Sequence, residues 1–149
     1  MSSPTAPPLD HSAVRFSLPS TVTAPRLMRS LVAALLATAG RPHLTDAARL
    51  CVSELTTNVH RHTDTPVIHL DVTVHPGRVT VAVWDDSGDI RPSPLPDACG
   101  GQGSAEHGRG LLLVHELSAA WGVAWPVPRD RRRKTVWFAL DEEMAGRAH

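Results

Sequence analysis

The chain has 149 residues, enough for one domain with a hydrophobic core of its own. Its 15 basic residues balance 15 acidic ones, so the net charge does not indicate nucleic acid or an anionic membrane as a partner. No apolar run approaches the roughly 18 residues that cross a bilayer, and the N-terminus lacks the basic and apolar regions of a signal peptide.

Residues 1–12 contain three prolines and no periodic pattern, which predicts a flexible leader. Residues 13–141 are predicted to form a single domain, followed by a polar tail over residues 142–149. The two cysteines, Cys51 and Cys99, make no disulfide framework, which suits a reducing compartment. We therefore expect a cytoplasmic protein that contacts neither membrane nor nucleic acid directly.

Hydrophobic periodicity predicts helices and strands in mixed order along the chain. The expected elements are, in chain order, a strand over residues 14–18, a helix over 23–40, a helix beginning near the plausible N-cap Thr45 and ending near 63, a strand hairpin over 67–74 and 78–85, a helix over 111–117, and closing strands over 122–125 and 135–140.

The second predicted helix carries polar residues beside its apolar stripe. Glu54, Asn58 and His62 are spaced i, i+4 and i+8 and so share one narrow strip of the helix surface. Cys51 and Leu55 lie beside that strip, and burying an uncompensated carboxylate is costly. Two interpretations of Glu54 and Asn58 are open. They are either the polar edge of a core helix, with their hydrogen bonds satisfied locally, or part of a site that binds a polar ligand.

The strand over residues 78–85 ends in an acidic residue on its apolar face. Val79, Val81, Val83 and Asp85 share that face by the two-residue period of a strand. Asp85 therefore stands where an apolar side chain is expected. An ordinary strand end that caps a turn is the alternative.

The segment over residues 87–107 is rich in proline, glycine and serine and is too long for an ordinary connection, which is typical of a functional loop or of disorder. It ends in His107, Gly108, Arg109 and Gly110, directly before an apolar run that begins at Leu111. Glycines at the start of a helix let backbone N–H groups approach an anion closely. Alone, this pattern is a weak indication.

Together these motifs resemble the GHKL, or Bergerat-fold, ATP-binding superfamily, and in particular the anti-sigma-factor serine kinases of bacterial partner-switching systems. The resemblance extends over about residues 14–141. The matching motifs are SELxxNxxxH at residues 53–62, a strand ending in an Asp-x-Gly-like pattern at 83–88, HGxGLxLV at 107–114, and a final strand opening with Lys-Thr at 134–135.

The resemblance implies a two-layer α/β sandwich, with a mixed, mainly antiparallel sheet covered on one face by helices, that binds ATP and Mg²⁺. It implies that Asn58 supplies an amide oxygen to Mg²⁺ and that Glu54 accepts the proton of the attacking hydroxyl. Asp85 would accept the adenine amino proton, and Thr135 would support that contact.

The remaining nucleotide-binding residues that the resemblance implies are Ser87, Gly88, His107, Gly108, Arg109, Gly110 and Leu111. The two glycines of the HGRG motif would let the helix N-terminus hold phosphates, and residues 89–107 would form the ATP lid.

The sequence departs from the family pattern after the strand. With Asp85 as the family aspartate, Ser87 replaces the motif glycine and Gly88 is one position out of register. Aligning Asp86 instead restores the turn but points the carboxylate to the other face, and we adopt Asp85 because the valine alternation selects it. Arg109 either assists phosphate binding or is a surface side chain.

The predicted activity is that of a serine/threonine protein kinase that binds a sigma factor and phosphorylates an anti-anti-sigma antagonist. The alternative is a binding module that keeps the fold and sequesters a transcription regulator without phosphotransfer. A separate histidine-kinase catalytic domain is disfavoured, because nothing upstream resembles a dimerisation helix with a phosphoacceptor.

Three other features of the sequence are less specific. His60 and His62 diverge by roughly 200° on a helix and cannot chelate one ion together. The basic run over residues 129–134 is typical of a solvated turn, with an acidic partner as the alternative. The helix over residues 23–40 is predicted to face the core, and its wide apolar surface leaves a homodimer open.

Overall fold

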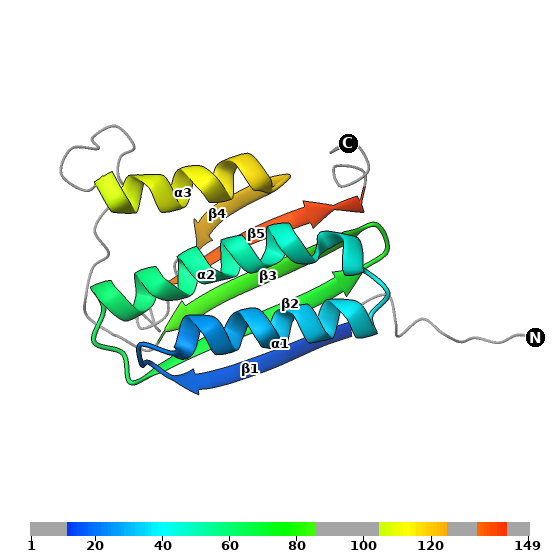
Figure 1. Cartoon of the computed structure of the whole chain (residues 1–149). Helices are drawn as coiled ribbons and strands as arrows, with labels where there is room; N and C mark the ends of the chain where they lie inside the picture. Colours follow the sequence, from blue (N-terminus) through cyan, green and yellow to red (C-terminus); the bar gives the residue numbers. More distant parts are fainter. Residues whose placement is uncertain (1–11, 86–104, 125–133, 143–149) are drawn as a thin grey trace, which may run out of the picture.

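The computed structural model describes residues 12–85, 105–124 and 134–142, which form three α-helices, one short 3₁₀ helix and five strands (Figure 1). In chain order they are β1 (Ser12–Pro19), α1 (Ala24–Thr38), η2 (Pro42–Leu44), α2 (Thr45–His62), β2 (Val67–His75), β3 (Arg78–Asp85), α3 (Ala105–Leu117), β4 (Ala120–Ala124) and β5 (Thr135–Asp141). Residues 1–11 of the predicted leader, residues 86–104 of the predicted loop and lid, residues 125–133 and the tail from residue 143 lie outside the described residues.

The strands form one sheet in the order β1-β2-β3-β5-β4. Each pairing among these described strands is antiparallel, so the sheet has no parallel component there, where a mixed sheet was expected. β2 and β3 form the predicted hairpin, and Gly77 in its turn has φ of 77°, which favours glycine because it has no Cβ. β3 and β4 are not neighbours in the sheet, because β5 lies between them. In the chain, α3 lies between β3 and β4.

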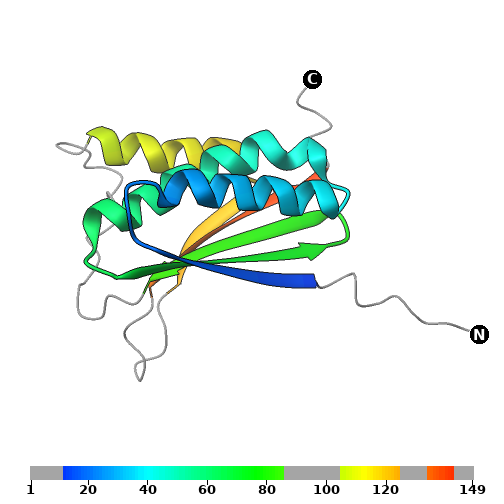
Figure 2. The same cartoon turned by 60° about the horizontal axis from the view of Figure 1, so that its bottom comes forward.

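The helices cover a single face of the sheet (Figure 2). The core lies between the two layers because the alternate residues of β2 and β3 that face the helices are apolar and buried. The largest side chains in this core, all less than 2% exposed, are Phe138, Met28, Leu36, Leu55, Ile68 and Leu70. The predicted two-layer sandwich is confirmed.

The apolar face of α1 packs on this core, as the sequence predicted. Met28, Val32 and Leu36 are fully buried, and Leu31 and Leu35 pack against the same cluster. Leu27 on the same helix is 46% exposed, so the core accounts for only part of the apolar width of α1. The homodimer stays a prediction.

Two helix starts differ from the predicted ones. Thr45 is the first residue of α2 rather than its cap, because the 3₁₀ turn η2 leads directly into the helix. α3 begins at Ala105, so Gly108 and Gly110 lie inside its first turns and not in a loop before it. Glycine lowers helix propensity by about 1 kcal/mol, but the packing of Leu111 and Val114 on the core supports the helix through this segment.

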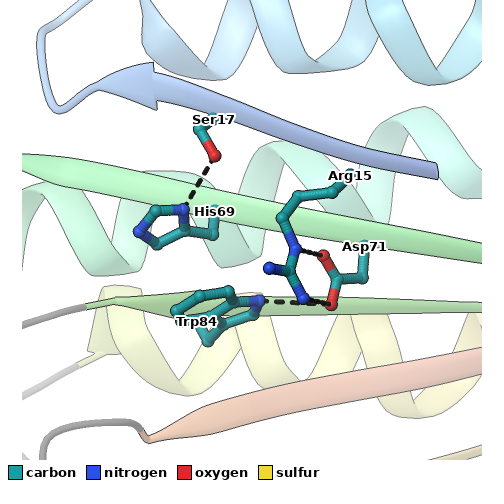
Figure 3. Close-up of polar contacts among 5 residues, drawn as sticks. All are labelled: Arg15, Ser17, His69, Asp71 and Trp84. Carbon is teal, nitrogen blue, oxygen red and sulfur yellow. Dashed lines mark hydrogen bonds and ion pairs between the residues drawn. The ribbon is translucent and has the colours of Figure 1, made fainter.

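The face of the sheet that carries no described helix is closed by a polar and aromatic layer on β1, β2 and β3 (Figure 3). Arg15 donates two hydrogen bonds to Asp71, at 2.7 and 3.1 Å, and its guanidinium carbon lies 5.0 Å from the ring centre of Trp84. His69 stacks on Trp84 with ring centres 4.0 Å apart, and its Nδ1 lies 2.8 Å from Ser17 Oγ. Trp84 is consequently only 6% exposed.

None of the helices in the described ranges is long and apolar enough to cross a membrane.

Candidate functional site

Four element ends meet at one end of the domain. In both views the C-terminal end of α2, the end of β3 and the start of α3 lie at the same end (Figures 1 and 2). β5 runs antiparallel to β3, so its first residues lie beside the last residues of β3, with Trp84 opposite Thr135. Antiparallel pairing therefore brings residues near 85 and 134 to the place where α2 ends.

On α2, Glu54 and Asn58 lie at the border of the buried stripe. Both are partly buried, and their neighbours Cys51, Leu55 and Val59 are buried in the core. Burial, together with the smaller effect of the nearby negative charge of Glu54, raises the pKa of the Cys51 thiol to about 12. The predicted arrangement of a carboxylate and an amide beside the apolar face is confirmed, and the roles of the two residues stay predictions.

The two histidines of α2 do not form a metal site. His62 is exposed, whereas His60 Nδ1 lies 3.0 Å from Ser20 Oγ and so ties the helix to the segment after β1. Within the described ranges no group of three or more His, Cys, Asp or Glu residues is placed to hold a metal ion.

Asp85 ends β3 on the face that the helices cover. It is only 1% exposed and pairs with the fully buried Ile68. Val81 and Val83 precede it on the same buried face, so the alternation that selected Asp85 is confirmed. A carboxylate buried at the end of a strand, beside the end of a helix, is placed to accept a hydrogen bond from a ligand. Asp86, Ser87 and Gly88 lie outside the described residues.

Thr135 does not share the face of Asp85. It lies opposite Trp84, and directly opposite residues in a sheet point to the same face, which for this pair is the one without helices. Thr135 was predicted to support the adenine contact. The register instead pairs it with Trp84, so its side chain points to the face of the sheet opposite to that of Asp85.

Lys134 directly precedes β5 and lies on the side of the sheet that Asp85 faces, whereas Thr135 does not. Continuing the β3–β5 register by one residue places Lys134 opposite Asp85. Burial lowers the pKa of Lys134, and the attraction of Asp85 partly opposes this shift, so the two charges are close. The sequence contains a signal for this placement. Phe138 and Val136 belong to the core side of β5, and the two-residue period of a strand, continued back from them, reaches Lys134.

The backbone of the HGRG motif, residues 107–110, belongs to α3. His107, Gly108, Arg109 and Gly110 lie in the first turns of α3, and Leu111 packs against the core beside them. α3 packs against α2, so the start of α3 lies near the half of α2 that carries Asn58. The rest of the predicted lid lies outside the described residues.

This set of groups fits a magnesium nucleotide. Asp85 offers a buried acceptor suited to an amino group, and Asn58 offers a neutral amide oxygen. Mg²⁺ is held in such sites by one or two protein oxygens together with phosphates and water, so no cluster of protein carboxylates is needed. The helix start at residues 105–110 adds backbone N–H groups that suit phosphate oxygens.

Comparison with known proteins agrees with this geometry. A family model described as the histidine kinase-like ATPase domain matches residues 18–139, a span that includes Glu54, Asn58, Asp85 and Lys134. A search of curated proteins gave no match. Because the family match covers most of the chain, the protein belongs to the histidine kinase-like ATPase domain family and is an ATP-binding domain of the GHKL type.

Proposed function

We propose that this domain is a serine/threonine protein kinase of the anti-sigma-factor type, which binds a sigma factor and phosphorylates an anti-anti-sigma antagonist. The observation that carries the proposal is the pair Glu54 and Asn58 on one strip of α2, a helix whose C-terminal end lies at the same end of the domain as the end of β3, where Asp85 is the last residue. A domain that only bound nucleotide would need Asn58 and Asp85, but would not need a carboxylate four residues before Asn58.

The proposed mechanism assigns one task to each of these residues. Asp85 accepts a hydrogen bond from the adenine amino group and so orients the nucleotide. Asn58 would hold Mg²⁺ through its amide oxygen, and the ion would supply positive charge that offsets the charge of the phosphates. Glu54 would accept the proton of the partner's serine hydroxyl as the serine oxygen forms a bond to the γ-phosphorus of ATP. The bond between that phosphorus and the β,γ-bridging oxygen breaks, and its electron pair leaves with ADP. Glu54 is only partly buried, so a partner's hydroxyl has access to it.

The first experiment measures ATP binding by calorimetry in the presence of Mg²⁺. The wild type is expected to bind, and Asn58→Ala is expected to lose most of the magnesium-dependent affinity. Thr57→Ala is the matched control, because Thr57 is a neighbouring, partly buried residue on α2 that points about 100° away. Absence of binding by the wild type would contradict the proposal at its base.

The second experiment measures phosphate transfer from ATP to a serine-containing antagonist. Glu54→Gln keeps the size of the side chain but removes the base, so transfer is expected to fall by about 100-fold or more while ATP affinity changes little. Transfer at the wild-type rate would remove Glu54 from the proposed role.

The alternative, a module that binds a regulator without phosphotransfer, is favoured by one feature of the sequence. Ser87 stands where the family motif has glycine, directly after the strand that carries Asp85. If the wild type binds ATP and a partner but shows no transfer, the binding module is the function to retain.

A further inference from the structure

Asp85 is the last residue of β3, and Lys134 directly precedes β5. Extending the register by one residue beyond its last pair, Trp84 and Thr135, puts Lys134 opposite Asp85, and the attraction of Asp85 for the Lys134 ammonium indicates that the two groups are close. The Cβ atoms of directly opposite residues lie about 4.5–5.5 Å apart. Both side chains are expected on the face that the helices cover, because side chains two residues apart in a strand share a face. Asp85 is two residues after Val83, and Lys134 is two residues before Val136, and both valines pack on the core side.

This placement puts a hydrogen-bond donor next to an acceptor at the end of the sheet where β3 ends. A carboxylate accepts, and a lysine ammonium only donates. Adenine presents the complementary pair on one edge, since its amino group donates and the adjacent ring nitrogen, N1, accepts. Thr135 cannot supply the second contact because its side chain points to the opposite face of the sheet.

We infer that Lys134 is a specificity-determining residue of the nucleotide site, which donates a hydrogen bond to the ring nitrogen of adenine beside the amino group that Asp85 binds. The inference rests on nucleotide binding as proposed above and adds a second contact to the base. The lysine is partly buried, and burial lowers its pKa against the attraction of Asp85. An ammonium held in such surroundings is incompletely hydrated, so a ligand acceptor improves its environment.

A simpler role for Lys134 is that of a counterion to Asp85 in the ligand-free protein. In that case the lysine competes with adenine for the carboxylate, and its removal strengthens binding. A lysine that contacts the phosphates instead would also weaken nucleotide binding when removed, but would have no effect on a nucleoside. The three roles therefore predict different results for the same substitution.

The test is calorimetry with ADP and with adenosine. Lys134→Met removes the charge and the donor but keeps the length of the side chain, and Thr135→Val is the control on the other face of the sheet. Lys134→Met is expected to weaken both ligands by about tenfold or more, as for the loss of a hydrogen bond to a charged group. Thr135→Val is expected to bind both as the wild type does, and Lys134→Arg is expected to restore part of the affinity.

Each other outcome overturns the inference. Equal or tighter ADP binding by Lys134→Met identifies a counterion, and a loss confined to ADP identifies a phosphate contact. If the wild type binds neither ligand, the proposed function fails together with the inference, whereas wild-type binding without an effect of Lys134→Met defeats the inference alone. Thermal unfolding without ligand checks that the variants fold, and Lys134→Ala serves as a second variant should Lys134→Met not fold.

Discussion

Replacing Asp85 by asparagine should separate nucleotide binding from stability. Asparagine has nearly the same shape, but it offers one acceptor and two N–H donors in place of a carboxylate. A hydrogen bond to a charged group contributes about 1.5–3 kcal/mol, so ATP affinity should fall by about 10- to 150-fold. Stability should not fall with it, because Asp85 is only 1% exposed, and removing the cost of burying its charge offsets the lost attraction to Lys134.

The free energy of unfolding of ligand-free Asp85→Asn is expected to equal that of the wild type or to exceed it by about 1–2 kcal/mol at most. Lys134 loses its neighbouring charge in this variant, but it is only partly buried and can extend its ammonium group to water. Urea denaturation measures the stability, and calorimetry with ATP and Mg²⁺ measures the affinity.

Asp71→Asn is the matched control for this variant. Asp71 belongs to the same sheet, but it pairs with Arg15 on the face without helices (Figure 3). Its substitution should leave ATP affinity unchanged. The reasoning about Asp85 would be refuted by an Asp85→Asn protein that binds ATP within threefold of the wild type, or by one that loses several kcal/mol of stability, since the carboxylate would then serve the fold.

Three further predictions concern the core and the sheet. In folded Cys99→Ser protein at pH 8, Cys51 should not react with a chromogenic disulfide reagent, because burial is the main cause that raises the pKa of its thiol to about 12. A rapid change in the absorbance of the reagent before the protein unfolds would contradict this. Gly122→Ala should lower the free energy of unfolding by about 1 kcal/mol, because a Cβ there would lie 3.1 Å from the Trp137 ring, and an unchanged urea midpoint would show that the ring moves freely. Phe138→Ala should lower it by about 3–5 kcal/mol, since Phe138 is fully buried, and a loss below 1 kcal/mol in urea denaturation would place it outside the core.

Local periodicity was sufficient for much of the fold and for the first three site residues. The spacing of Glu54 and Asn58 placed both on one strip of α2, and the alternation of valines placed Asp85 on the buried face of β3. Both patterns depend only on the geometry of a single element, 3.6 residues per turn in a helix and two per repeat in a strand. The sequence therefore contains them without reference to the rest of the chain.

The proposed second contact to the base could be inferred only from the tertiary structure. Lys134 and Asp85 are far apart in the sequence, and only the register between β3 and β5 shows that Lys134, and not Thr135, lies on the side of Asp85. A shift of one residue reverses the face of every side chain in a strand, so sequence similarity at a strand start does not decide which residue enters the site.

The start of α3 was likewise decided by packing. The sequence pattern placed Gly108 and Gly110 directly before a helix that begins at Leu111, whereas the structure continues the helix through both. Contacts with the core supply most of the stability of a short helix and outweigh the local preference of two residues. The sequence by itself thus determined the family, the two-layer fold and the polar strip of α2, while strand register and helix packing, which arise from contacts between distant segments, decided which side chains surround Asp85.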